Sequence, residues 1–507
     1  MLETSISKGF TEFSAGLLDA RHRGAIFLSG SFSWAVDWYF RHHTCNQTQT
    51  QNQIQGQLSE KINEAKQAEP TGPTGLAELG AIFCEAASEP LSDIFCAQWR
   101  AFNKVESAGE PEINFISSKT YRHHLGRENH AIFFADPAFN LDAFAALSGT
   151  LVAGGIMYIW LSDESNVDEA EQVTTSNFLE RLKAYVADQQ GIYHVYQSQT
   201  ERTVFGRYLK DESTVFCNAK TESSHQFPAA REAREAGLPS DALLPAITAQ
   251  ATAEQLIAVK YIEKVLTGGR NKPLVLTADR GRGKSTALAL ATAQLFFASE
   301  RALNIVITAP HKMALGVYFT QLRKLLDDSQ EGKYQISDHQ ITWRQHCLTF
   351  MAVDELLRSQ YHSKSNPDLL LIDEAAGIPV YLLNKLVAQH HRIVFSSTIH
   401  GYEGAGKGFT GKFIPMLSAK GLQVKTLTLN EPIRWANHDP LEQLIFKTCL
   451  LNASLGELDV CAVKEQGFAP EYRYFTGDEL AQNEQLLVHV FAILVTAHYQ
   501  TKPSQAT

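Results

Sequence analysis

The chain has 507 residues, 44% of them hydrophobic and 20% charged, and its formal net charge at pH 7 is −10. This length allows two or three domains with cores of their own. The acidic balance excludes a protein coated in basic surface, so any contact with nucleic acid must be local. The longest apolar stretch, residues 147–161, is too short to span a bilayer, and the N-terminus lacks the pattern of a secretory signal. We therefore expect a globular, cytoplasmic protein with no membrane span.

The first 235 residues are predicted to form an α/β domain. Three short apolar runs have the length of strands and alternate with segments of helical periodicity: residues 25–28, 131–134 and 156–161. Residues 44–75 are rich in Gln, Asn, Thr, Glu and Pro, a composition that buries too little apolar surface to order itself. We predict a disordered surface insertion there. A segment rich in Ala, Pro, Glu and Arg at 225–250 is predicted to be a linker, which places a domain boundary near residue 235.

Residues 236–455 are predicted to form a single RecA-like P-loop NTPase domain with a parallel sheet. Five apolar runs alternate there with helical segments, which favours parallel pairing. They are residues 274–277, 304–308, 368–372, 392–396 and 422–429. Ligands of open α/β sheets bind at the carboxyl ends of strands, so we expect the site at that edge. Because the sequence shows one nucleotide-binding loop, we expect a clamp or conformational switch rather than a processive two-lobed motor.

The first of these runs leads into Ala-Asp-Arg-Gly-Arg-Gly-Lys-Ser at 278–285, followed by a helix-forming stretch. This pattern predicts a P-loop, in which successive backbone N–H groups cradle phosphate oxygens at a helix N-terminus. Gly281 and Gly283 allow the close approach of the backbone. Lys284 is expected to act in catalysis by reaching the β- and γ-phosphates of ATP, and Ser285 to help hold Mg²⁺. The alternative is a chance match, against which the flanking strand and helix argue.

A second motif, Leu-Leu-Leu-Ile-Asp-Glu at 369–374, has the form of a buried strand that ends in two carboxylates. Asp373 is expected to bind Mg²⁺ directly or through water, and Glu374 to orient or deprotonate the attacking water. The alternative is a strand that happens to end in an acidic turn. After the next strand, residues 397–408 offer hydroxyls that would sense the γ-phosphate and glycines that would permit movement, or they form a plain flexible loop.

Less specific candidates lie outside these motifs. Three basic clusters are either nucleic-acid contacts or ordinary solvated surface. They are Arg21, His22 and Arg23; Arg122, His123, His124 and Arg127; and Lys407, Lys412 and Lys420. By spacing alone, Arg434 is one candidate for a γ-phosphate contact among many arginines, and Gln255 either reads an adenine edge or is a solvated residue at a helix start.

Taken together, these segments resemble the bacterial tRNA(Met) cytidine acetyltransferase family. The resemblance rests on residues 277–285, 308–310, 372–379, 397–409 and 431–435 of the second half, and on 125–128, 139–143 and 149–155 of the first. In that family a RecD-like ATPase module is joined to a GNAT acetyltransferase domain, which acetylates N4 of the wobble cytidine of elongator tRNA(Met) with acetyl-CoA and ATP hydrolysis. The resemblance implies ATP contacts at Gln255, Arg434, Thr277, Ala278, Asp279, Arg280, Gly281, Arg282, Gly283, Lys284, Ser285 and Thr286.

Residues 456–507 are expected to be the start of a truncated GNAT domain, with 485–503 as its opening helix. The sequence shows no Arg/Gln-x-x-Gly-x-Gly/Ala loop for the pyrophosphate of acetyl-CoA. The chain alone is therefore expected to act as an ATPase that binds ATP and Mg²⁺, with elongator tRNA(Met) as its partner. Two alternatives stay open: a stand-alone ATP-dependent RNA-binding or helicase-like module, and a remnant with no function of its own. The sequence predicts no oligomeric state.

Overall fold

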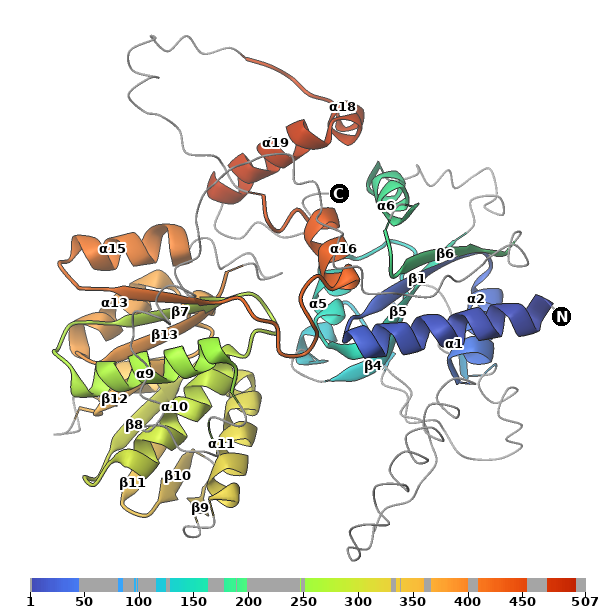
Figure 1. The fold of residues 1–507 in the computed structure, drawn as a ribbon. Helices are drawn as coiled ribbons and strands as arrows, with labels where there is room; N and C mark the ends of the chain where they lie inside the picture. Colours follow the sequence, from blue (N-terminus) through green and yellow to red (C-terminus); the bar gives the residue numbers. More distant parts are fainter. Residues whose placement is uncertain are drawn as a thin grey trace, which may run out of the picture.

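Two α/β modules, each built around a twisted sheet, organise the protein (Figure 1). The computed structural model describes residues 2–44, 81–84, 95–96, 98, 115–124, 128–162, 177–187, 189–197, 247, 251–329, 334–337, 339–359, 366–399, 409–453 and 472–497. The predicted insertion beyond residue 44, the predicted boundary at 235 and the glycines at 404–408 lie outside these residues. Of the helices described, none is long and apolar enough to cross a membrane.

The N-terminal sheet has six strands within the described residues, all in parallel pairs, in the order β3-β2-β4-β5-β1-β6. The strands are β1 Gly24–Ser29, β2 Ala81–Cys84, β3 Phe115–Ile116, β4 Asn129–Ala135, β5 Leu151–Leu161 and β6 Ile192–Tyr196. Successive side chains of a strand point to opposite faces, so Phe27 and Ile26 enter different clusters. Helices α1 Leu2–Ala20 and α2 Phe32–Tyr39 cover one face, and α5 Leu141–Ser148 and α6 Asn177–Ala187 cover the other.

The second sheet has eight strands in the described part of the chain, in the order β14-β7-β13-β12-β8-β11-β10-β9. They are β7 Leu274–Ala278, β8 Asn304–Thr308, β9 Gln335–Ile336, β10 Gln340–Trp343, β11 His346–Phe350, β12 Leu369–Ile372, β13 Ile393–Thr398 and β14 Lys425–Leu429. The pairs from β14 to β11 are parallel, and β10 and β9 extend the edge in antiparallel pairs. The predicted parallel sheet is thus confirmed, with an antiparallel edge that the sequence did not indicate.

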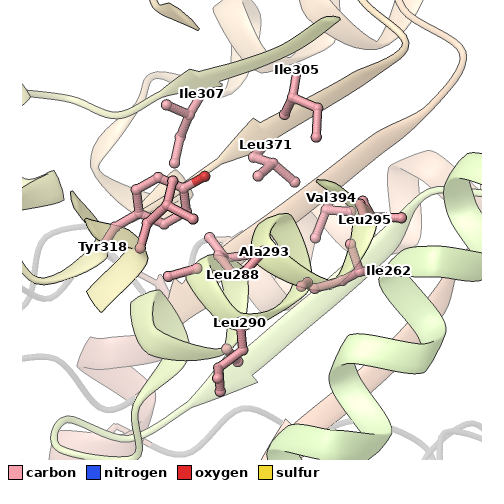
Figure 2. Close-up of a cluster of buried hydrophobic side chains, with 14 of the residues drawn as sticks. Ile262, Leu288, Leu290, Ala293, Leu295, Ile305, Ile307, Tyr318, Leu371 and Val394 are labelled. Carbon is pink, nitrogen blue, oxygen red and sulfur yellow. The ribbon is translucent and has the colours of Figure 1, made fainter. Parts of the chain in front are cut away.

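Helices cover both faces of this sheet. One face packs against α9 Ala253–Thr267, α10 Lys284–Ala298 and α11 Gly316–Asp328. Figure 2 shows how Leu288 of α10 and Tyr318 of α11 lie over Ile307 and Leu371 of the strands. The opposite face packs against α12 Val353–Ser359, α13 Val380–Gln389 and α15 Ile414–Ala419. A sheet buried on both faces explains the continuous apolar runs in its strand sequences.

After β14 the chain leaves the second sheet and returns to the first. Helix α16 Pro440–Thr448 lies between the two modules (Figure 1) and buries Leu441, Leu444 and Ile445 against Phe144 of the N-terminal core. Among the described residues that follow are the helices α18 Gly477–Gln482 and α19 Glu484–Ala497. The boundary at residue 455 stays a prediction, but α16, which lies before it, packs with the N-terminal module.

Candidate nucleotide site

The predicted P-loop joins β7 to α10 in the conformation that its glycines allow. Gly281 and Gly283 have φ angles of 79° and 71°, in the left-handed region that glycine adopts without steric cost. Gly283 is the N-cap of α10, and no side chain caps the helix there. The first N–H groups of a helix lack intrahelical partners. This turn therefore has the geometry of an anion-binding helix N-terminus.

Lys284, buried at the start of α10, connects the P-loop with the two neighbouring strand ends. Its Nζ donates to Oγ1 of Thr398, the last residue of β13, at 2.8 Å. Thr398 in turn donates to Oε2 of Glu374 at 3.1 Å, and Lys284 Nζ lies 3.9 Å from Oε1 of Glu374. Phosphate oxygens would replace Thr398 and Glu374 as partners of the ammonium group, which makes this network suited to respond to the γ-phosphate.

Ser285 and Asp373 form the second pair of the site. Ser285 Oγ donates to Asp373 Oδ2 at 2.6 Å, and Asp373, at the end of β12, is fully buried. The buried hydroxyl of Thr308, at the end of the adjacent strand β8, has no hydrogen-bond partner among the described residues. Hydroxyl and carboxylate oxygens are the ligands that Mg²⁺ prefers, so the residues present fit this ion.

Asp373, the residue directly after β12, has a perturbed pKa. Burial and then the charge of Glu374 raise its pKa, against the opposing effects of the Ser285 hydrogen bond and the Lys284 charge. A bound cation would favour its ionised form.

Glu374 follows in a strained conformation. Its φ of 46° is left-handed, which costs a non-glycine residue about 1–2 kcal/mol. Its N–H donates to Oδ1 of Asp373 at 3.0 Å, and its carbonyl accepts from Gly377 at 2.9 Å. The carboxylate, 41% exposed, thus points out of the sheet while Asp373 stays inside it. Strain of this kind often accompanies a functional constraint.

Gln255 supports the P-loop from α9. It is the N3 residue of a capping box with Thr252, and it is 1% exposed. Its Nε2 donates to the carbonyl of Gly283 at 3.0 Å. The solvated alternative for Gln255 was therefore wrong, because the side chain is buried against the turn.

The segment from Asn430 to Asp439, here called the strap, covers the P-loop from the other side. Glu254 at the start of α9 accepts from the N–H groups of Asn430 and Glu431 at 2.6 and 3.0 Å, which anchors the strap's first turn. Ile433 then donates its N–H to the carbonyl of Gly281 at 3.0 Å. A Cβ on Gly281 would lie 2.7 Å from Cη2 of Trp435, so that ring edge rests on the turn. The sequence motif at 431–435 is therefore a P-loop cover.

Arg434, between these two residues, is directed to the N-terminal module. Its Nη1 donates to the carbonyl of Gly149 at 3.0 Å, and its Nε lies 3.6 Å from Glu128. Burial lowers the pKa of Arg434; the Glu128 charge opposes this effect, while the charges of Arg280 and Arg23 add to it. The structure thus places Arg434 close to Arg280 of the P-loop, and its contact with ATP stays a prediction.

The other predicted contact residues divide between the loop and its supports. Arg282 pairs with Glu442 of α16 at 2.9 Å, and the Thr277 hydroxyl donates to the carbonyl of Leu427 in β14 at 3.1 Å. Both side chains are therefore engaged in packing the loop against its surroundings. Ala278 is buried, whereas Asp279, Arg280 and Thr286 are half-buried.

The basic cluster at 21–23 lies largely inside the molecule. His22 and Arg23 are each 2% exposed, and His22 Nε2 contacts the carbonyl of Asn437 in the strap at 2.8 Å. Both interpretations of the sequence, solvated surface and nucleic-acid contact, were wrong for these two residues. No local pattern in the sequence distinguishes an arginine buried between modules from a solvated one. The sequence analysis did not name four further residues of the site individually: Thr398, Ile433, Trp435 and Glu442. The motifs at 397–409 and 431–435 contain three of them, but their contacts depend on residues far away in the sequence.

Two family models match the chain. "tRNA(Met) cytidine acetyltransferase TmcA, N-terminal" matches residues 1–197, and "RNA cytidine acetyltransferase NAT10/TcmA, helicase domain" matches residues 275–452. The chain is 44% identical over 266 residues to tRNA(Met) cytidine acetyltransferase TmcA of Vibrio cholerae, which covers 52% of this chain and 36% of that protein. It is 34% identical over 424 residues to the enzyme of the same name from Nitrosococcus halophilus, which covers 80% of this chain and 51% of that protein. The chain thus spans about half the length, or less, of these two relatives.

Partial similarity to solved structures is also found. The large terminase of a thermophilic bacteriophage aligns over 35% of this chain and 45% of its own, with 14% identity and a TM-score of 0.26. The Pif1 helicase from Candida albicans aligns over 36% of this chain and 40% of its own, with 19% identity and a TM-score of 0.23.

Proposed function

The chain belongs to the tRNA(Met) cytidine acetyltransferase family, and we propose that it provides the ATP-binding and ATP-hydrolysing part of N4-acetylation of cytidine in elongator tRNA(Met). The observation that carries this proposal is the convergence of Lys284, Asp373, Glu374 and Thr398 at the carboxyl edge of one sheet. Acetyl-CoA is the acetyl donor of the proposed reaction. A tRNA substrate also supports a cytoplasmic location.

Each residue has a defined task in the proposed hydrolysis. The N–H groups of the P-loop and the Lys284 ammonium bind the phosphates. Ser285 and Asp373 would hold Mg²⁺, which neutralises phosphate charge when it is bound. Glu374 accepts a proton from the attacking water, and its exposed carboxylate is the group of the pair that can reach that water. Thr398 links Lys284 to Glu374, so phosphate binding also changes the hydrogen bonds of the base.

Glu374→Gln tests the hydrolytic role. The substitution keeps the shape of the side chain and removes the base, so we expect ATP to bind with unchanged Kd while kcat falls by about 10²- to 10⁴-fold. Glu355→Gln, which neutralises an exposed carboxylate in the first turn of α12, is the matched control and should retain full turnover. Equal turnover in the two variants would remove Glu374 from catalysis.

Acetyl transfer is measured in the same preparation, with labelled acetyl-CoA, tRNA(Met) and ATP. Acetylated tRNA would support the complete family reaction. ATP hydrolysis without acetylation would favour the second candidate, an ATP-dependent RNA-binding module whose transferase is supplied separately. Absence of both ATP binding and hydrolysis would contradict the proposed function.

A basic cleft supports an RNA contact on the ATPase module. It has a volume of about 280 Å³, and Lys312, Arg323 and His339 contribute basic groups to its wall beside Phe319. Lys312 lies in the 3-10 helix η6 Lys312–Leu315, which follows the carboxyl end of β8. Phosphate oxygens would pair with the cations, and Phe319 offers a surface for a base. Such a local patch agrees with the acidic net charge of the chain.

The same segment packs against the turn that follows Glu374. A Cβ on Gly377 would lie 2.8 Å from Cγ of Pro310, so the turn that follows Glu374 packs against the residues that lead to Lys312. RNA bound in the cleft would therefore be able to shift the turn that follows Glu374, through the residues between Pro310 and Lys312. This contact supports stimulation of ATP hydrolysis by RNA.

Arg323→Glu tests the RNA contact. Charge reversal in the cleft should weaken tRNA binding and abolish the stimulation of ATP hydrolysis by RNA, while hydrolysis without RNA stays unchanged. Lys324→Glu is the control, because Lys324 is the exposed neighbour on α11 and does not line the cleft. Equal loss in the two variants would assign the effect to net charge and contradict a specific contact.

A further inference from the structure

Arg23, the residue before β1, is a deeply buried charge between the two modules. Its guanidinium is 2% exposed and pairs with Asp439, which is fully buried, at 2.8 Å. Its Nη1 donates to the carbonyl of Ser148 at 2.7 Å, and its backbone N–H donates to Oδ2 of Asp439 at 2.6 Å. The side chain is thus held both by the N-terminal module and by the end of the strap, which fixes where its guanidinium plane lies.

That plane supports the strap. The Arg23 guanidinium carbon lies 3.3 Å from the centre of the Trp435 ring, a separation that allows cation–π attraction and direct packing. The far edge of the same ring rests on Gly281 of the P-loop. Arg23, Trp435 and Gly281 therefore form a continuous line of contact from the N-terminal module to the phosphate-binding turn.

The P-loop needs such support because its glycines are permissive. Gly281 and Gly283 carry no side chains that restrict the turn, and glycine loses more conformational entropy on ordering than any other residue. A turn that is already ordered before ATP arrives avoids that loss on binding. Whatever holds Trp435 in place therefore raises the affinity for phosphate.

Arg23 does more than hold the two modules together, as a comparison with another buried arginine shows. A second buried arginine, Arg181 of α6, also joins the N-terminal module to the end of the chain: it pairs with Glu484 at 2.8 Å and donates to the carbonyls of Thr448 and Lys447. Its guanidinium carbon lies 5.4 Å from the ring of Tyr185. The two arginines have similar partners, but only the aromatic neighbour of Arg23 touches the P-loop.

We propose that Arg23 is a positioning residue for the nucleotide site, which holds the Trp435 ring against Gly281 and keeps the P-loop ordered for phosphate. The proposal rests on the ATP binding inferred above. It makes the N-terminal module a determinant of nucleotide affinity through a residue that does not touch the nucleotide.

The test compares Arg23→Met with Arg181→Met in the full chain. Both variants lose a buried arginine and leave a carboxylate without its partner, so both should lower the melting temperature. Only Arg23→Met should raise the Kd and the KM for ATP, by about tenfold, which corresponds to about 1.4 kcal/mol. We expect its kcat to stay within about twofold of the wild-type value, because Arg23 contacts no reacting group.

Arg23→Lys and Arg181→Lys provide the second comparison. Lysine keeps the charge opposite the carboxylate but lacks the flat guanidinium that stacks on an aromatic ring. Stability should largely return in both lysine variants, whereas ATP affinity should stay reduced in Arg23→Lys alone. Wild-type affinity in Arg23→Lys, or equal Kd values in the two methionine variants, would overturn the proposal. A wild-type chain that binds no ATP would instead overturn the proposed function and be recognised separately.

Discussion

Gly283 combines a left-handed backbone, the start of a helix and contact with the strap. Its φ of 71° excludes most other residues, and an added Cβ would overlap Ile433 of the strap and lie 2.6 Å from Nε2 of Gln255. Both the backbone torsion and the packing around this position therefore exclude residues with a side chain. Gly316, at the start of α11, provides an unrestricted comparison, because a Cβ added there would meet no atom of a neighbouring segment within 4 Å.

Gly283→Ala should abolish ATP binding and destabilise the protein, since the left-handed conformation alone costs alanine about 1–2 kcal/mol. Gly316→Ala should leave ATP binding intact and raise stability by up to about 1 kcal/mol, because alanine favours a helix over glycine. Thermal unfolding with and without ATP measures both effects. Normal ATP binding by Gly283→Ala would mean that the turn tolerates another conformation.

The lowered pKa of His194 in β6 leads us to expect that the free energy of unfolding depends on pH. Burial, and then the charge of Lys183, lowers its pKa from 6.5 to about 4, and its Nε2 lies 2.7 Å from Oγ of Ser29. The folded state binds this proton more weakly than the unfolded state. The stabilising contribution is thus complete above pH 6.5 and is lost as the pH falls towards 4.

Between pH 7.5 and pH 5.0 this single group should lower the free energy of unfolding by about 2 kcal/mol. His194→Gln removes the titrating group and keeps a hydrogen-bonding side chain beside Ser29, so its loss of stability over the same interval should be smaller by that amount. Urea unfolding at the two pH values provides the comparison. Parallel losses in wild type and variant would contradict the assignment to His194.

Among the helices, α9 has a role beyond its own packing. Its N-terminal residues Thr252, Glu254 and Gln255 cap the helix, anchor the strap and hold the carbonyl of Gly283. The helix start is therefore a shared support for both sides of the P-loop. Helix α18 begins with the same type of capping box, at Thr476 and Glu479, but its described side chains are exposed or half-buried.

Thr252→Ala should cost about 1 kcal/mol, as the loss of an N-cap does in general. It should also raise the KM for ATP, because the backbone N–H of Gln255 loses its acceptor, the Thr252 hydroxyl, and the first turn that positions the Gln255 side chain is loosened. Thr476→Ala removes an equivalent cap and should leave the KM unchanged. Steady-state hydrolysis with both variants separates the two consequences. A KM shift of the same size in Thr476→Ala would show that capping acts through global stability alone.

The molecule as a whole is joined by a helix that crosses between its modules. Helix α16 follows β14 after the strap, yet its Leu444 is fully buried in the N-terminal core. The strap, which covers the P-loop, connects β14 to α16. The candidate nucleotide site therefore lies where the chain passes from one module to the other (Figure 1).

Leu444→Ala should cost about 2–5 kcal/mol, as a buried Leu→Ala substitution does, and the loss should fall on the N-terminal sheet. Hydrogen exchange of β1 and β5 should accelerate more than that of β7 and β13. Leu322→Ala in α11, which is equally buried in the core of the second sheet, should give the reverse pattern. Faster exchange in both sheets for either variant would mean that the two modules unfold as one unit.

Local sequence was sufficient where conformation and chemistry act within a few residues. The turn between β7 and α10 was predictable because a short strand, two glycines and a helix start lie next to each other, an arrangement in which backbone N–H groups can bind phosphate. The place of Asp373 and Glu374 directly after a buried strand was predictable because they follow a continuous apolar run. The central strands β8, β12 and β13 were predictable for the same reason, since burial on both faces requires apolar residues at nearly every position. The two-residue strands β3 and β9 are too short for such a run and were missed, as was β2, although its four residues are apolar.

Long-range packing decided the remaining features. Arg23 and Asp439 are 416 positions apart, and nothing in either neighbourhood specifies that they meet. From the sequence, Gln255 is a polar residue at a helix start. It is buried and supports the P-loop only because α9 packs beside that turn. Torsional preferences and helix caps are encoded residue by residue, whereas the encounter of two modules depends on many weak apolar contacts summed over both cores. The amino-acid sequence alone therefore determined the glycine turn and the carboxylates of the candidate nucleotide site, and the packing of the modules determined which distant side chains support them.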